Sequence, residues 1–157
     1  MKRSKFKADQ ITISKIYYKS GSLDNANYEG KDPENYLITV DFSSAYNIET
    51  KKVRSEIKFE ISGKFEDDII SKAIYNIVFF FHVENLEELC IKEGDQQKID
   101  GNLGNALTSI SYSTSRGLLT ARLQGTPLQN FILPVINPND LLNKKIKTKT
   151  DEIKDNL

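Results

Sequence analysis

The sequence is poor in the residues on which catalysis, metal binding and covalent cross-links depend. Its 157 residues include one histidine, one cysteine and no tryptophan, and 22 Lys and Arg balance 22 Asp and Glu. The single Cys90 forms no disulfide within the chain, and no N-x-Ser/Thr motif occurs, which together favour a reducing, cytoplasmic setting. The zero formal charge gives no overall field for nucleic acid or an anionic membrane. A partner is therefore expected to be recognised by shape and apolar contact.

Long apolar runs and a secretion signal are missing as well. No stretch approaches the length that spans a bilayer, so no membrane insertion is expected. The basic start MKRSKFKADQ lacks the apolar run and the cleavage site of a signal peptide. With 38% hydrophobic and 28% charged residues, the composition is typical of one soluble globular domain.

The residues that could perform chemistry are too few, and their spacing in the sequence does not fit a catalytic site. A triad or metal site would have to combine His82 with Cys90 or nearby glutamates, and the spacing fits neither. Cys90 is expected as a small buried hydrophobe, and the acidic pairs at 67–68 and 87–88 as solvated residues. No phosphate-binding glycine motif follows a strand, and the aromatic residues are not interleaved with a basic stripe. We therefore expect no enzyme, metal, cofactor or nucleic acid.

Alternating apolar residues predict an antiparallel sheet in the first half of the chain. We expect four strands, near residues 11–18, 36–42, 53–65 and 74–83. A phase slip between Ile13 and Ile16 indicates a β-bulge. Residues 20–35 are rich in Gly, Asn, Asp and Ser and are expected to form a long loop.

The fourth predicted strand is apolar on both faces, which predicts a surface for contact with polypeptide. If helices cover only one side of the sheet, some rings of Ile77–Phe81 lie on the uncovered side. Each such ring forgoes about 1.5–3 kcal/mol of burial unless something else covers it. A second subunit, a loop of the same chain or a bound client would provide that cover.

Helical spacing follows the sheet. One stripe predicts a long amphipathic helix: Leu103, Ala106, Leu107, Ile110, Thr114, Gly117, Leu118 and Ala121. A second stripe on the same helix is expected to pack against another subunit: Tyr112, Leu119 and Leu123. The middle of this helix, LTSISYSTS, alternates like a strand, and close packing by small residues would explain it.

The helix is expected to end at a glycine–proline break. Gly125–Pro127 interrupts the periodicity, and LQNFILPVI continues as an extended apolar segment. Asn137 and Pro138 form an N-cap and first helical position, which predicts a short final helix through Leu142. The sequence therefore predicts an α+β fold with a four-stranded antiparallel sheet, a long helix and a short C-terminal helix.

The stretch GNLGNALTSISYSTSRGLLTARLQGTPLQNFILPVINPNDLL, from Gly101 to Leu142, resembles the SecB protein-export chaperones. The residues that fall where that pattern would place them are Gly125, Thr126, Pro127, Leu133, Pro134, Val135, Asn137 and Leu141. TISKIYYKS, from Thr12 to Ser20, is similar to the first strand of the family. The resemblance covers residues 10–142, with 1–9 as a flexible lead-in and the Lys-rich tail 143–157 frayed or disordered.

The resemblance implies a homotetrameric, ATP-independent holdase that binds unfolded chains in apolar grooves between sheet and helices. On this basis the expected client-binding residues are Ile77, Phe79, Phe81, Leu118 and Leu133. Export members of the family are acidic and present carboxylates on the open sheet face to dock the motor SecA. This chain is neutral, has no acid between Ile74 and Phe81, and has Ser20 where an acid is expected, which argues against docking on SecA.

Three classes of function remain open from the sequence. The first is a SecB-like holdase, either a general one for protein export or one dedicated to a single client such as an antitoxin. The second is a non-catalytic adaptor or structural subunit whose apolar face is covered permanently by one partner. The third is an enzyme or small-ligand protein of unrecognised type, which would need polar groups converging on a pocket.

Overall fold

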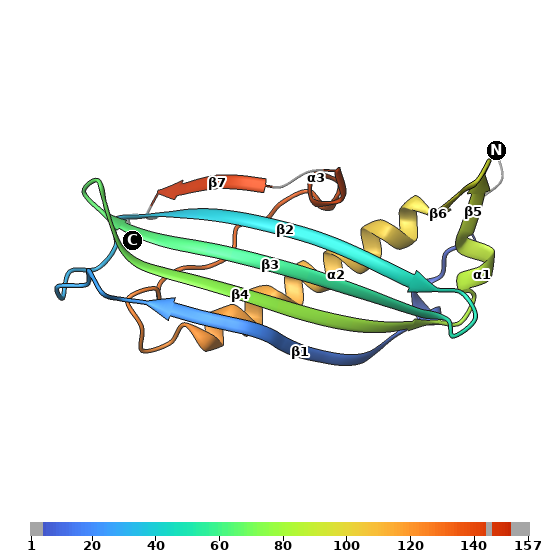
Figure 1. Cartoon of the computed structure of the whole chain (residues 1–157), viewed down its shortest axis with the longest axis horizontal. Coiled ribbons are helices and arrows are strands. Elements are labelled where there is room, and N and C mark those ends of the chain that lie inside the picture. Colours follow the sequence, from blue (N-terminus) through green and yellow to red (C-terminus); the bar gives the residue numbers. More distant parts are fainter. Residues whose placement is uncertain (1–4, 144–145, 152–157) are drawn as a thin grey trace.

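The strands of the first half form one antiparallel sheet that packs against a long helix. The computed structural model describes residues 5–143 and 146–151 (Figure 1). The long strands are β1 (Ile11–Asp24), β2 (Asn35–Asn47), β3 (Lys52–Phe65) and β4 (Asp68–Val83). They lie in the order β1-β4-β3-β2, and helix α2 (Gly101–Arg122) crosses one face diagonally. The short helix α3 (Pro138–Asn143) follows, so the predicted α+β class is confirmed.

Strand β1 is bent twice where it pairs with β4. The register shifts at residues 13–15, which confirms the predicted bulge, and again at 18–20. The strand then continues until Asp24 pairs with Lys72, so residues 20–24 belong to the sheet and not to the expected loop. The reason is the length of β4, whose 16 residues supply backbone partners to polar residues that show no apolar alternation of their own.

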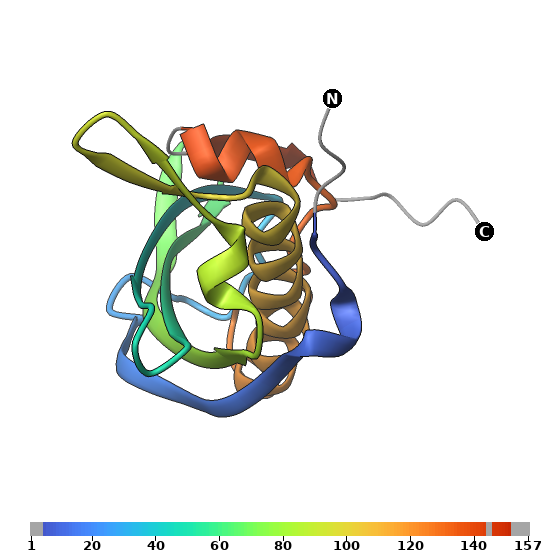
Figure 2. The ribbon, with the colours of Figure 1, turned by 90° about the vertical axis from the view of Figure 1, so that its right-hand side faces the viewer.

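Four short elements were not predicted: one precedes β1, and three lie between β4 and α2. A short 3-10 helix (Ala8–Gln10) precedes β1, and α1 (Leu86–Leu89) follows β4. Strands β5 (Cys90–Glu93) and β6 (Gln96–Ile99) pair into a hairpin that projects away from the sheet and from α2 (Figure 2). These segments are too short and too polar to produce a periodic signal.

The structure describes parts of the two segments that were expected as a flexible lead-in and a frayed tail. Phe6 is half-buried and packs against the core, although residues 1–4 lie outside the described part of the chain. Strand β7 (Ile146–Asp151) pairs with β2 and extends the sheet at that edge. The tail was expected to be frayed; residues 144–145 and 152–157 fall outside the described residues.

Small hydroxyl residues form the line of α2 nearest to the sheet. Thr108, Ser111 and Ser115 are completely buried. The hydroxyl of Thr108 donates to the carbonyl of Gly104 at 2.7 Å, and that of Ser111 donates to the carbonyl of Leu107 at 2.8 Å. Because the hydroxyls of Thr108 and Ser111 bond within the helix, these two polar residues can be buried there without a partner on the sheet, whereas the Ser115 hydroxyl is buried without a hydrogen bond. This explains how the stretch LTSISYSTS forms a helix despite its strand-like alternation.

The stripes predicted from helical spacing differ in phase from the buried face of α2. The first stripe is buried at Leu103 and Leu107 but is exposed at Gly117. The buried face continues instead through the residues expected to contact another subunit: Tyr112, Leu119 and Leu123. The Tyr112 ring centre lies 6.2 Å from that of Phe59 on β3, so this stripe belongs to the core of the chain itself. The predicted stripe and the buried face differ in phase because serines are buried on α2, and a hydropathy pattern counts serine as polar.

Gly63 on β3 provides a test of how tightly the apolar segment after α2 packs on the sheet. A methyl group at this position would lie 2.7 Å from Pro33 Cγ and 2.8 Å from Leu128 Cδ2. We expect Gly63→Ala to lower the free energy of unfolding by about 1–3 kcal/mol through overpacking. The control is Gly101→Ala, where nothing lies within 4 Å. Urea unfolding of both variants measures the difference, and equal midpoints would contradict this packing.

Candidate functional site

Three of the residues expected to bind clients lie in the core. Ile77, Phe79 and Phe81 are completely buried on the face of β4 that packs against α2. The rings of Phe79 and Phe81 stack with centres 6.1 Å apart. Of the other two, Leu133 is buried and Leu118 is half-buried. Phe79 and Phe81 are closed off from solvent by the packed core, so the structure opens no groove on these side chains.

The alternate residues of β4 lie on the uncovered face of the sheet, as the doubly apolar run predicted. Phe80 stacks on Tyr17 of β1, with ring centres 6.4 Å apart, and remains half-buried. Val78, the register partner of Tyr17, is completely buried although it lies on the face of the sheet away from α2. Neighbouring side chains of the sheet therefore provide part of the cover that these residues need.

The most exposed apolar side chains lie on the extended segment after α2. We call residues 128–137 the apolar segment. Leu128, Phe131 and Leu133 are buried, whereas Ile132 is 62% and Val135 is 90% exposed. The sequence predicted this extended segment as part of the client groove and named Leu133 in it, but it did not single out the exposed Ile132 and Val135. The available signal was the alternation within LQNFILPVI, which makes one side of the segment face water if the other faces the core.

Hydrogen bonds from α2 fix the backbone of the apolar segment. The hydroxyl of Tyr112 donates to the carbonyl of Pro134 at 2.6 Å, and Arg116 Nε donates to the carbonyl of Leu133 at 2.9 Å. Arg116 Nη2 also donates to the Pro134 carbonyl, at 3.3 Å. Burial raises the pKa of Tyr112 to about 12, although nearby Arg116 acts to lower it. The exposed Val135 is therefore presented on a backbone that is held in place.

The Tyr112 hydroxyl gives a prediction for alkaline stability. Its pKa lies above the ordinary value of 10.0, so the stability that it contributes is present below pH 10.0 and is lost as pH rises towards about 12. We expect Tyr112→Phe to cost about 1 kcal/mol at neutral pH, because the Pro134 carbonyl loses its donor. The difference in free energy of unfolding between wild type and variant should then become smaller above pH 10.0. Urea unfolding at neutral and alkaline pH measures this difference. A difference that grows with pH would contradict the hydrogen bond assigned to the Tyr112 hydroxyl.

Two hollows flank α3. One of about 120 Å³ lies between α2, the apolar segment and α3, and its lining includes Ser113, Val135 and Leu141. The other, of about 150 Å³, lies between the start of α2, the sheet and α3, and its lining includes Phe42 and the exposed Leu142. A cavity of about 150 Å³ admits one benzene-sized group, so each hollow fits about one large side chain. We call the two hollows together with Ile132, Val135 and Leu142 the α3 surface.

A second apolar region joins the free edge of β1 to the outer side of α2. Within the described residues β1 has β4 as its one neighbour, and its side chains Ile13 and Ile16 are exposed. The 22 residues of α2 contain no acidic residue and no lysine. Its exposed positions beyond the first turn are Ser113, Gly117, Ala121 and one charged residue, Arg122, whose guanidinium lies over the Tyr18 ring. The hydroxyl of Tyr18 donates to the carbonyl of Leu118 at 3.0 Å and ties β1 to α2 here. We call this region the β1–α2 side.

The residues weighed for chemistry are not brought together. His82 Nε2 lies 2.9 Å from Glu84 Oε1 on the surface, and Cys90 is half-buried, with a thiol pKa that burial raises. Among the residues that the structure describes, no group of three or more His, Cys, Asp or Glu is placed to hold a metal ion. Over the same residues, none of the helices is both long and apolar enough to cross a membrane.

Comparison with known proteins finds similarity in structure. No protein-family model matches the chain, and no curated protein matches it in sequence. Among solved structures, the chain is similar to the SecB-like chaperone Rv1957 of Mycobacterium tuberculosis, in complex with a ChAD peptide from the Rv1956 HigA1 antitoxin. The match has a TM-score of 0.55 and 14% sequence identity, and it covers 82% of this chain and 93% of that chain. The chain therefore has the fold of a SecB-like chaperone.

Proposed function

We propose that the chain is an ATP-independent chaperone that holds unfolded or partly folded polypeptides at the α3 surface. The observation that carries the proposal is the exposure of Val135 and Ile132 on a backbone fixed by Tyr112 and Arg116. Exposed apolar side chains of this kind are costly to leave in water and mark a surface for binding. The fold likeness to a SecB-like chaperone supports the same function.

The geometry of the α3 surface suits an unfolded client. An extended polypeptide would lay apolar side chains against Ile132 and Val135 and place one large side chain in each hollow. Because the apolar segment is already held by α2, little ordering entropy is lost on the chaperone side when a client binds. Recognition by apolar contact also suits a chain with zero formal charge.

The client range is either general or limited to one partner. The similar protein Rv1957 is in complex with an antitoxin peptide, which supports a dedicated role for this chain with a client of comparable kind. A general role in export would use the same surface. We do not include docking on SecA, because the outward positions of β4 from Lys72 to His82 carry no carboxylate.

We further propose that subunits associate through the β1–α2 side into dimers or tetramers. A long edge strand with exposed Ile13 and Ile16 offers unpaired backbone groups to a second copy. The outer side of α2 is open around Gly117, which allows a second helix to approach closely there, and its exposed charge is at the helix end, at Arg122. Light scattering should give a multiple of the 17.9 kDa chain mass, and Gly117→Arg should shift it towards the monomer. A wild-type monomer would overturn this part of the proposal.

The chaperone function is tested by suppression of aggregation. A chemically unfolded protein is diluted into buffer with the purified chain and no nucleotide, and light scattering follows aggregation. Suppression at near-stoichiometric ratio supports the proposal, whereas no suppression, together with a single tightly bound partner recovered with the native protein, would favour an adaptor subunit. Recovery of many partners from the native protein would indicate a general holdase, and recovery of one would indicate a dedicated chaperone.

A further inference from the structure

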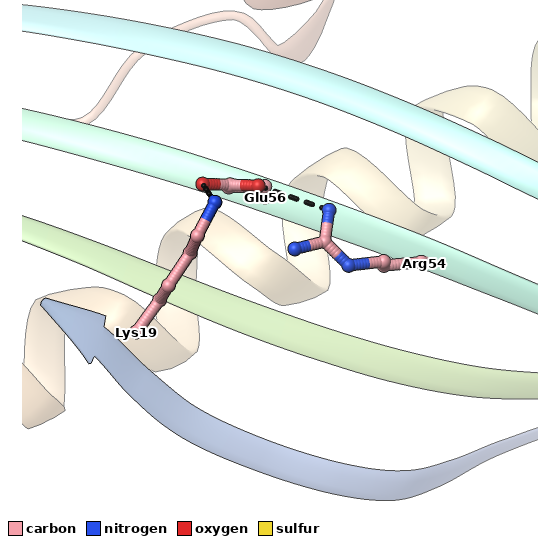
Figure 3. Close-up of polar contacts among 3 residues, drawn as sticks. All are labelled: Lys19, Arg54 and Glu56. Carbon is pink, nitrogen blue, oxygen red and sulfur yellow. Dashed lines mark hydrogen bonds and ion pairs between the residues drawn. The ribbon is translucent and has the colours of Figure 1, made fainter.

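The uncovered face of the sheet carries a patch of aromatic and cationic side chains that the chaperone function does not use. The strand register places Lys15 and Tyr17 of β1 beside Phe80 and Val78 of β4 on this face. Lys52, Arg54 and Glu56 of β3 lie beside the same part of β4. We call these residues, with Lys19, the outer patch. Figure 3 shows three of its members, Lys19, Arg54 and Glu56, in front of the sheet, with α2 behind the sheet.

The outer patch has an excess of positive charge although the chain is neutral. Its cations are Lys15, Lys19, Lys52 and Arg54, and its one carboxylate is Glu56. The excess of three positive charges is not balanced by the adjacent positions of β2, which are Ser43, Ala45 and Asn47. At the end of β4, Glu84 lies near His82 and Lys51, so its charge is matched locally.

Glu56 is fully engaged by two of these cations. Lys19 Nζ lies 3.1 Å from Oε1 and Arg54 Nη1 lies 2.9 Å from Oε2, so each carboxylate oxygen has its own cation (Figure 3). Partial burial acts to raise the pKa of Glu56, but the hydrogen bonds from Lys19 and Arg54 outweigh it and lower that pKa. Glu56 therefore stays ionised and positions the two cations over the sheet, while leaving the net charge of the patch positive.

The centre of the outer patch is apolar. Phe80 and Tyr17 stack with an angle of 19° between their rings, and Lys15 Nζ lies 5.0 Å from the centre of the Tyr17 ring. Phe80 and Tyr17 both keep part of their surface in contact with water. An apolar centre with a charged rim is the usual arrangement of a protein–protein interface.

We propose that the outer patch binds an acidic polypeptide segment that carries an aromatic or large apolar side chain. The carboxylates of the partner would pair with Lys15, Lys52 and the exposed parts of Lys19 and Arg54, and its apolar side chain would lie on Phe80. Charge complementarity of this kind mainly sets specificity and association rate. The proposal is independent of client binding, because the α3 surface lies across the sheet from the patch.

Single-stranded nucleic acid fits the outer patch less well. Bases bind by stacking on free ring faces along a positively charged groove. Here Tyr17 and Phe80 stack on each other and Lys15 lies over Tyr17, which leaves one partly exposed ring, Phe80, and no row of free ring faces for successive bases. Three excess positive charges also neutralise few phosphates of a nucleic acid, whereas they are enough to pair with the carboxylates of a short acidic segment.

The test is fluorescence anisotropy with a short labelled peptide in which one phenylalanine is flanked by aspartates. We expect saturable binding at low salt, roughly tenfold weaker for the variant Lys15→Glu/Lys52→Glu and weaker again at high salt. The charge-matched control is Lys7→Glu/Lys92→Glu, which changes exposed lysines elsewhere and should bind as the wild type does. Changing the phenylalanine of the peptide to alanine should also weaken binding.

Three results would overturn the outer patch as an acidic-peptide site. They are absence of saturable binding by the wild type, equal weakening by the Lys7/Lys92 control, and tighter binding of a single-stranded oligonucleotide than of the peptide. Val135→Asp should leave peptide binding unchanged. Failure of the outer patch is thereby distinguished from failure of the α3 surface, which the aggregation assay measures separately.

Discussion

Phe79→Ser is expected to unfold the chain, whereas Phe80→Ser, at the next residue, is expected to leave the chain folded. Phe79 is completely buried under α2 and stacks on Phe81. Removing a buried phenylalanine ring costs about 3–5 kcal/mol, and the introduced hydroxyl would be buried without a partner. Such a loss approaches the whole stability of a small domain, which is about 5–15 kcal/mol.

Phe80 is the matched control because it is the next residue of the same strand and has the same side chain. It faces away from α2 and is half-buried against Tyr17, so we expect a loss of about 1 kcal/mol for Phe80→Ser. Thermal and urea unfolding, followed by circular dichroism, measure both variants. A folded Phe79→Ser variant of near wild-type stability that had lost client binding would contradict the core assignment and restore the groove expected from the sequence.

Val135→Asp is expected to weaken client holding strongly while the fold is kept. Val135 is 90% exposed, so the substitution removes almost no packing within the chain. A central apolar contact of an interface contributes on the order of 2 kcal/mol, and its replacement by a charge should weaken client binding about 30-fold. The change is measured as the chaperone concentration needed to halve the aggregation of an unfolded protein.

The control for Val135→Asp is Ile91→Asp. Ile91 is also exposed, at 48%, but lies on the β5–β6 hairpin and not on the α3 surface. Both variants gain the same charge and should unfold at the same urea concentration as the wild type. If Ile91→Asp lost holding as fully as Val135→Asp, the α3 surface would not be the client site.

The fold could be predicted because strong local signals coincide with its main elements. Strict alternation in β3 and the doubly apolar β4 gave the sheet, and the break at Gly125, where φ is 75°, gave the end of the helix. The β5–β6 hairpin and β7 were missed, because their residues are mainly polar and their pairing depends on neighbours in space.

The site could be predicted only in part. Periodicity identifies which residues of a strand share a face, but it does not show which face a helix will cover, so Phe79 was placed in a groove that α2 fills. The buried face of α2 could not be predicted correctly, because Ser111 and Ser115 are buried but count as polar in any hydropathy pattern. The exposure of Val135 depends on the hydrogen bonds of Tyr112 and Arg116 to carbonyls of the apolar segment, which only the folded chain shows.

Hydrogen exchange of the chain with and without an unfolded client tests the central claim most directly. The measurement uses the full chain, a client that stays unfolded in buffer, and no nucleotide. We predict slower exchange in residues 131–142, which cover the apolar segment from Phe131 onward and α3 up to Leu142, and no change in β4. Protection absent from residues 131–142, or faster exchange in β4 as α2 leaves the sheet, would contradict a preformed α3 surface as the place where clients are held.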